Sequence, residues 1–99
     1  MRYRIVTTDD FNRWLTRIRD RQAARAIARR LDRAAAGNLG DIKPVGQGVS
    51  EMRIFAGPGY RLYFTIRDGE LVILLCGGNK STQSRDIARA QRILSEMEV

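Results

Sequence analysis

Apolar residues recur at two different spacings, which separate a helical first third of the chain from a strand-rich remainder. Between residues 11 and 18 the apolar positions follow the spacing of one helix face, after Thr8 and Asp9, either of which can cap a first turn. A second helical stripe occupies residues 20–36 and stops before Gly37. These stripes predict a helical hairpin, or one helix with a break between them.

Strand patterns dominate the second half. Residues 49–56 and 60–67 each alternate between two faces, and the glycine-rich turn 57–59 between them predicts an antiparallel pair. An Asp-Gly turn at 68–69 leads into the apolar run 71–76. A run without alternation predicts a central strand that is covered, at least in part, on both faces.

Weaker patterns complete the chain. Residues 3–6 predict an opening strand, and residues 37–48, rich in turn formers, predict a loop pinned to the core by a few apolar side chains. Ser81 or Thr82 is positioned to cap a last helix. We therefore expect one α+β domain over residues 1–99, in the order β-α-α-β-β-β-α.

The amino-acid composition excludes several kinds of active site. The chain has 99 residues, no histidine and one cysteine, so a Ser-His-Asp triad, a Cys-His dyad, a histidine zinc site and an internal disulfide are all excluded. Cys76, at the end of the apolar run, is expected to be a small buried residue. No stretch approaches the roughly 20 apolar residues of a membrane span, and the N-terminus lacks the apolar segment of a signal peptide. We expect a cytoplasmic protein with no metal, no cofactor and no membrane contact.

Positive charge is concentrated in the first third of the chain. The formal net charge is +7, and residues 1–36 contain ten arginines against four aspartates. Such a run is either a solvated helix face or a contact surface for a polyanion, which could be nucleic acid or an acidic protein. The candidate RNA-binding residues on the second helix are Arg25, Arg29, Arg30 and Arg33.

A second polar cluster is predicted on the sheet. Glu51 and Arg53 share one strand face, Arg61 points from the next strand, and Lys80 leaves the end of the following one. These four are the candidate catalytic residues: the cations can bind phosphate, and the glutamate can accept the proton of a ribose 2′-hydroxyl. In the alternative interpretation, Glu51 forms a structural cross-strand ion pair with Arg53 or Arg61.

Several segments form a pattern that is specific when they are taken together. They include Glu-Met-Arg-Ile at 51–54, Gly-Pro-Gly-Tyr-Arg-Leu-Tyr-Phe at 57–64 and Leu-Leu-Cys-Gly-Gly-Asn-Lys-Ser-Thr-Gln at 74–83. Further matches lie in the loop before the first of these and at 86–90. With them the chain resembles the RelE/ParE superfamily of toxin–antitoxin toxins, in its HigB-like, phage-related "addiction module killer protein" branch.

The resemblance implies a small twisted antiparallel sheet packed against an N-terminal helical hairpin and a C-terminal helix. It also implies a toxin that a HigA-like helix-turn-helix antitoxin neutralises, with operator DNA bound through that antitoxin. By position, Arg61 matches the arginine of the family's Tyr-Arg motif, Arg53 a basic residue on the preceding strand, and Lys80 the basic residue after the last strand. Glu51 stands where RelE itself has a basic residue.

Three functions follow as hypotheses. The first is a ribosome-dependent mRNA endonuclease that uses no metal and cleaves by attack of the 2′-hydroxyl. The second is a ParE-like poison of DNA gyrase without nuclease activity. The third is an interaction or DNA-binding subunit, although no recognition helix at helix-turn-helix spacing stands out.

Overall fold

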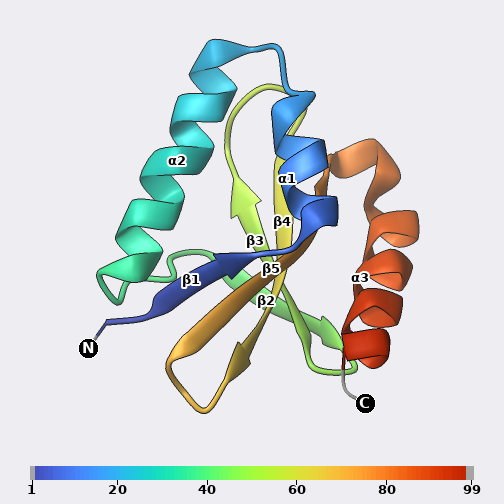
Figure 1. Cartoon of the computed structure of the whole chain (residues 1–99). Helices are drawn as coiled ribbons and strands as arrows, with labels where there is room; N and C mark the ends of the chain where they lie inside the picture. Colours follow the sequence, from blue (N-terminus) through green and yellow to red (C-terminus); the bar gives the residue numbers. More distant parts are fainter. Residues whose placement is uncertain (1, 98–99) are drawn as a thin grey trace.

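A computed structural model describes residues 2–97, in which a five-stranded sheet is covered by helices on both faces (Figure 1). The α+β class expected from the sequence is confirmed. The elements are β1 (Arg4–Thr7), α1 (Asp9–Thr16), α2 (Arg21–Ala35), β2 (Ile42–Gly46), β3 (Val49–Ile54), β4 (Tyr60–Arg67), β5 (Leu71–Gly78), the short 3-10 helix η1 (Lys80–Thr82) and α3 (Gln83–Met97).

The sheet is mixed rather than wholly antiparallel. Its strand order is β1-β5-β4-β3-β2, and β1 runs parallel to β5 whereas the other neighbours are antiparallel. The expectation of an antiparallel sheet is therefore wrong at this one edge. It fails because β1 pairs with the strand farthest from it along the chain, and no local pattern encodes the direction of such a pairing.

One strand was missed. Residues 42–46, expected to lie in a loop, form the edge strand β2 and pair with β3. Most of its side chains are exposed, so the strand carries no alternation of buried and exposed positions. Pro44 is tolerated there because an edge strand does not need every backbone N–H. The observed order thus has one strand more than the predicted order.

The other boundaries follow the sequence closely. Strand β4 occupies the predicted residues, β3 ends two residues early, and β5 continues two residues further. Thr8 caps α1 by accepting a hydrogen bond from the Phe11 backbone N–H at 3.1 Å, and Asp20 caps the separate helix α2. The predicted cap of the last helix is wrong: Asn79 caps η1, which leads directly into α3.

Apolar side chains form a core on each face of the sheet. One cluster lies under α1 and α2, and the other lies under α3 (Figure 1). The main residues of the first are Phe11, Ile27, Met52, Leu62, Phe64 and Leu74. Those of the second are Val49, Tyr63, Ile73, Leu75, Cys76, Ala90 and Leu94. None of the helices within residues 2–97 is long and apolar enough to cross a lipid bilayer.

We expect the two leucines of β5 to differ in their contribution to stability. Leu74 is fully buried in the first cluster, whereas Leu71 at the start of the strand is half-buried. Leu74→Ala should lower the free energy of unfolding by about 2–5 kcal/mol, through lost transfer energy and a residual cavity. Leu71→Ala is the matched control and should have a clearly smaller effect in urea unfolding. Equal losses would contradict this placement of Leu74.

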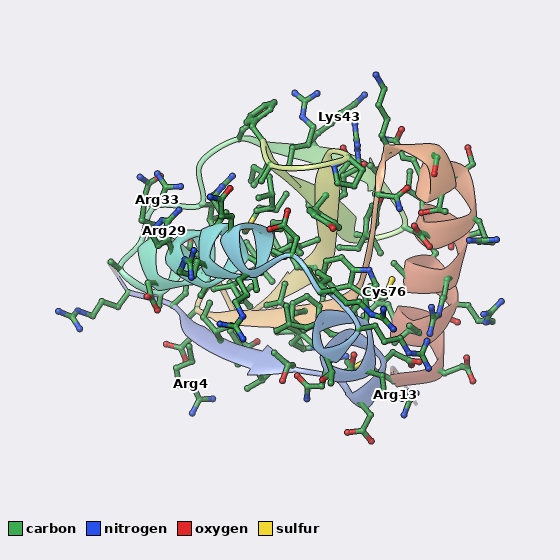
Figure 2. The ribbon with its side chains drawn as sticks, turned by 90° about the horizontal axis from the view of Figure 1, so that it is seen from above. Arg4, Arg13, Arg29, Arg33, Lys43 and Cys76 are labelled. Atoms are coloured by element: carbon green, nitrogen blue, oxygen red, sulfur yellow. The ribbon has the colours of Figure 1, made fainter. Side chains whose placement is uncertain are left out.

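The buried thiol of Cys76 should be unreactive in the folded protein. As expected, Cys76 is a fully buried free cysteine, and Figure 2 shows it between the sheet and α3. Burial raises the pKa of the thiol to about 12, so the reactive thiolate is scarce below that pH. A thiol reagent at pH 8 should label the protein in denaturant and leave the native protein almost unlabelled. Rapid native labelling would show that the thiol is accessible.

Candidate nucleic-acid interface

Three adjoining hollows run along one side of the molecule, between α2, the β3–β4 turn and η1. Their volumes are about 490, 330 and 270 Å³. Arg29 lines the first two, Arg53 lines the last two, and Phe55 lines all three. We call them together the basic groove. Its charged lining residues are Arg25, Arg29, Arg30, Arg33, Asp41, Arg53, Arg61 and Lys80.

The structure thus brings together all the cations that the sequence singled out, although they come from α2, β3, β4 and η1. Asp41 is the one acidic residue lining the groove within residues 2–97. Glu51, the remaining candidate, lies beneath the surface rather than in the lining. The groove is therefore a strongly positive surface.

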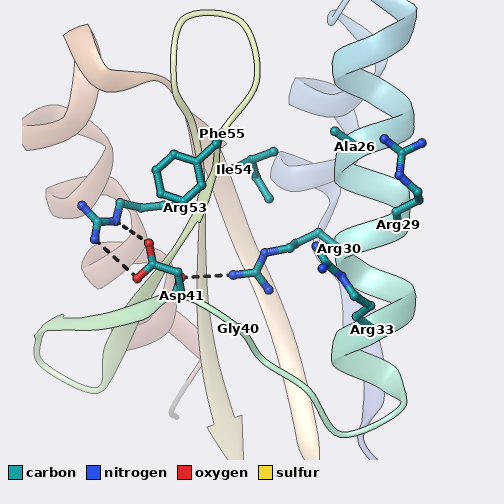
Figure 3. Close-up of a pocket in the computed structure, with 9 residues that line it drawn as sticks. All are labelled: Ala26, Arg29, Arg30, Arg33, Gly40, Asp41, Arg53, Ile54 and Phe55. Atoms are coloured by element: carbon teal, nitrogen blue, oxygen red, sulfur yellow. Dashed lines mark hydrogen bonds and ion pairs between the residues drawn. The ribbon is translucent and has the colours of Figure 1, made fainter.

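Helix α2 supplies a row of exposed arginines. Arg25, Arg29 and Arg33 follow at intervals of four residues, and none of them forms a hydrogen bond or ion pair with another side chain in the described part of the chain. Figure 3 shows Arg29 and Arg33 projecting from the helix beside the pocket. Like charges four residues apart on a helix repel one another. An anion bound here would relieve that repulsion.

Arg30 has a different environment from its neighbours on α2. Its side chain is buried and donates hydrogen bonds to the backbone carbonyls of Leu39 and Asp41, which joins α2 to the segment before β2 (Figure 3). Gly40, with a φ of +68°, passes so close that a Cβ atom would clash with the guanidinium. Burial, together with the nearby Arg33, lowers the pKa of Arg30, but the guanidinium stays charged.

This placement does not support the expected contact between Arg30 and RNA, because the guanidinium is committed to two carbonyls. A pattern in the sequence could have revealed it. Arg30 lies on the same helix face as Ala23, Ile27 and Ala34, which are the buried residues of α2. An arginine within an apolar stripe indicates a structural role.

Arg53 and Arg61 face each other directly across β3 and β4. Like charges in that position repel, and each arginine has its own carboxylate. Arg53 donates two hydrogen bonds to the Asp41 carboxylate, at 3.2 and 3.4 Å, and about 40% of each side chain is exposed. Arg61 Nε lies 3.5 Å from Glu51 Oε1, and these side chains are 11% and 1% exposed.

The Glu51 carboxylate is enclosed by partners. Gln83 at the start of α3 donates a hydrogen bond to it at 2.7 Å, and the Tyr63 hydroxyl donates another at 3.3 Å. Burial and the neighbouring carboxylate raise the pKa of Tyr63, so its hydroxyl remains a donor. With 1% of its side chain exposed, Glu51 cannot reach an RNA substrate in the groove. The contacts of Glu51 therefore match the alternative interpretation, in which it forms a cross-strand ion pair with Arg61.

Arg61 is oriented by these neighbours. Its Nη1 donates to the Gly59 carbonyl at 3.0 Å, and its Nε faces Glu51 without forming a hydrogen bond. Lys80 approaches from the other side: a Cβ atom on Gly59 would lie 3.6 Å from the Lys80 Cβ. The ammonium of Lys80 has no partner within residues 2–97. Arg53, Arg61 and Lys80 thus line the same small hollow.

Phe55 is the residue of the groove that the sequence analysis missed. Its side chain is 83% exposed, whereas the next most exposed large apolar residue in the described chain, Val6, is 44% exposed. It follows Arg53 by two positions, so in the alternating pattern it falls on the same face as Arg53, which is otherwise polar. An aromatic residue on a polar face was the available indication.

Within residues 2–97, no acidic or cysteine side chains gather in a group that could hold a metal ion. The groove instead presents guanidinium and ammonium groups, which bind carboxylates or phosphates.

Comparison with known proteins identifies the family. A family model described as "Phage derived protein Gp49-like (DUF891)" matches residues 9–98. The chain belongs to the phage-derived Gp49-like family. An uncharacterized protein of Haemophilus influenzae is 45% identical over 97 residues, which cover 98% of both chains. The match to the Gp49-like family includes every residue of the basic groove.

Neighbouring arginines of this Gp49-like chain should differ in their effect on stability. Arg30→Ala removes the N–H groups that donate hydrogen bonds to two backbone carbonyls. It should lower the free energy of unfolding by about 2–3 kcal/mol. Arg29→Ala, one residue earlier and exposed, should change it by less than about 0.5 kcal/mol. Thermal and urea unfolding of both variants test this. A stable Arg30→Ala protein would mean that the two hydrogen bonds do not hold the segment in place.

Proposed function

We propose that this Gp49-like chain is the toxin of a type II toxin–antitoxin pair, with a RelE/ParE-like fold of the HigB-like branch, and that it cleaves mRNA on the ribosome. One observation carries the proposal: the cations without partners on α2 and η1 meet Arg53 and Arg61 in a single groove. Membership of the Gp49-like family supports a toxin.

The charge pattern supports an extended polyanion as the ligand. Positive side chains line all three adjoining hollows of the groove, from α2 to η1. A single phosphate would occupy only one of these hollows, whereas a nucleic-acid strand can contact all three. Affinity of this kind depends on the release of counterions and falls with salt.

The small hollow beside Lys80 is the proposed cleavage site. There the ribose 2′-oxygen attacks the adjacent phosphorus, the bond from phosphorus to the 5′-oxygen breaks, and the products are a 2′,3′-cyclic phosphate and a 5′-hydroxyl. The 2′-hydroxyl loses its proton to water, and the leaving 5′-oxygen takes up a proton from water. Arg61, Arg53 and Lys80 stabilise the negative charge that develops on the phosphoryl oxygens.

Glu51 takes a positioning role in this proposal rather than the proton-transfer role expected from the sequence. Its buried carboxylate forms an ion pair with Arg61, and the Gly59 carbonyl accepts a hydrogen bond from the same guanidinium. A guanidinium held in place before the substrate binds loses little freedom when the charge develops.

The proposed partners come from the resemblance to HigB-like toxins. A HigA-like helix-turn-helix antitoxin would neutralise the toxin and connect it indirectly with operator DNA. The ribosome and its mRNA would be the targets. The exposed arginines of α2, which lie apart from the cleavage site, are suited to ribosomal RNA or to the mRNA backbone.

Variants of the small hollow test the proposed cleavage. Lys80→Ala changes an exposed side chain without a partner, so it should leave the fold intact and lower mRNA cleavage by about 100-fold. Arg61→Ala leaves Glu51 buried without its counter-charge, so it is combined with Glu51→Gln. This double variant should be folded and inactive. Growth after induction, and transcript ends mapped with and without translation of the transcript, are the measurements.

Arg92→Ala is the control, because Arg92 is an exposed arginine of α3 outside the basic groove. It should be as toxic as the unaltered chain. Undiminished cleavage by the folded Lys80→Ala and double variants would contradict the proposed site. Intact mRNA together with cleaved chromosomal DNA would instead favour the gyrase poison.

A further inference from the structure

The most exposed large apolar side chain in the described structure lies in the middle of the basic groove. Phe55 lines all three hollows of the basic groove and is 83% exposed. Figure 3 shows its ring beside Arg53, across the pocket from the arginines of α2. Leaving a phenylalanine ring in water forgoes the stabilisation that burial would provide. Phe55 does not pack into either apolar core, so the fold itself does not require the ring.

We propose that Phe55 is a stacking platform for an unpaired nucleobase of the bound RNA, an inference that rests on the proposed function. Base–aromatic stacking beside a cationic track is how proteins hold single strands without reading their sequence. Here the ring lines one hollow together with Arg29 and Arg33, and the adjoining hollow together with Arg61 and Lys80. Phosphates on either side of the stacked nucleotide could contact the two groups of cations.

Stacking on Phe55 selects the kind of RNA that the groove accepts. A ring can cover a base only when the face of that base is free, and the bases of an A-form helix are stacked on each other. The groove should therefore prefer single-stranded segments over duplexes of equal charge. By fixing one base, the ring also places the neighbouring phosphate relative to the hollow of Arg61 and Lys80, so Phe55 is a positioning residue.

A tight turn follows Phe55. Gly57 and Gly59 have φ values of +53° and +78°, which reverse the chain immediately beyond the ring. The next aromatic residue, Tyr60, packs edge-on against Trp14, with ring centroids 6.0 Å apart. Phe55 has no such ring partner in the described chain, so its face is available to a ligand.

The test measures binding by the purified chain, separately from cleavage. The probe is a short single-stranded 2′-O-methyl oligonucleotide, which cannot be cleaved because its 2′-oxygen is blocked, and inorganic polyphosphate serves as a polyanion without bases. Phe55→Leu keeps an apolar side chain but removes the ring, and Phe55→Trp keeps a ring. Arg33→Ala is the matched electrostatic variant. Affinities are measured by anisotropy over a range of salt concentrations, and by competition for polyphosphate.

Stacking predicts a specific pattern of results. Phe55→Leu should weaken oligonucleotide binding about 5- to 100-fold without changing the salt slope or polyphosphate binding. Phe55→Trp should bind as well as the unaltered chain or better. Arg33→Ala should reduce the salt slope for the oligonucleotide by about 0.7 and weaken polyphosphate binding as well. A duplex that carries the same number of phosphates should bind more weakly than the single strand.

Several results would overturn the inference. They are equal oligonucleotide binding by Phe55→Leu and the unaltered chain, equal losses for oligonucleotide and polyphosphate, and no binding by the unaltered chain at low salt. Loss of antitoxin binding with oligonucleotide binding intact would make Phe55 a protein contact instead. Failure of the proposed function looks different: ring-dependent oligonucleotide binding would persist while induction left mRNA uncut.

Discussion

The buried carboxylate of Glu51 is the constraint on which the β3–β4 side of the basic groove depends. Burying a carboxylate is strongly unfavourable unless its charge and its hydrogen bonds are satisfied. Here three residues from two elements are the partners: Arg61 and Tyr63 on β4, and Gln83 at the start of α3. Strand β3, which carries Glu51, is thus tied to β4 and to the helix above it at one point. The guanidinium of Arg61 is neutralised on its inner side and borders the groove on the other.

The cations of the groove differ in how deeply they are buried. The buried cations have structural contacts, and the exposed cations are available to a ligand. Arg30 and Arg61 are enclosed and hold backbone carbonyls or a carboxylate, so they define the shape of the groove. Arg29, Arg33 and Lys80 are exposed and have no side-chain partner in the described residues. Repulsion among exposed like charges opposes folding, whereas their summed field attracts an anionic ligand. The repulsion between these exposed cations is present in the basic groove, where a bound anion would relieve it.

Sequence patterns predicted the strands that carry an apolar face or an apolar run, and they missed the strand that carries neither. Strand β4 was predicted at its observed bounds because its alternation is regular; β2 was missed because both its faces are exposed. For the site, the gathering of Arg53 and Arg61 followed from strand pairing. The burial of Glu51 did not, because it depends on α3 packing over the sheet from a distant part of the chain. Phe55 was missed although it shares the polar strand face of Glu51 and Arg53, because an apolar residue near a strand end is ordinarily expected to pack into the core.

The two arginines that face each other across β3 and β4 have different capacities. The pair between Arg53 and Asp41 is about 40% exposed on both sides, and such surface pairs contribute little free energy. An incoming phosphate can therefore displace Asp41 from Arg53, while the Arg30 hydrogen bond to the Asp41 carbonyl keeps the backbone in place. The pair between Arg61 and Glu51 is sealed, so no ligand can replace Glu51 without opening the fold. Arg53 is thus suited to capturing an anion, and Arg61 to presenting a fixed charge to it.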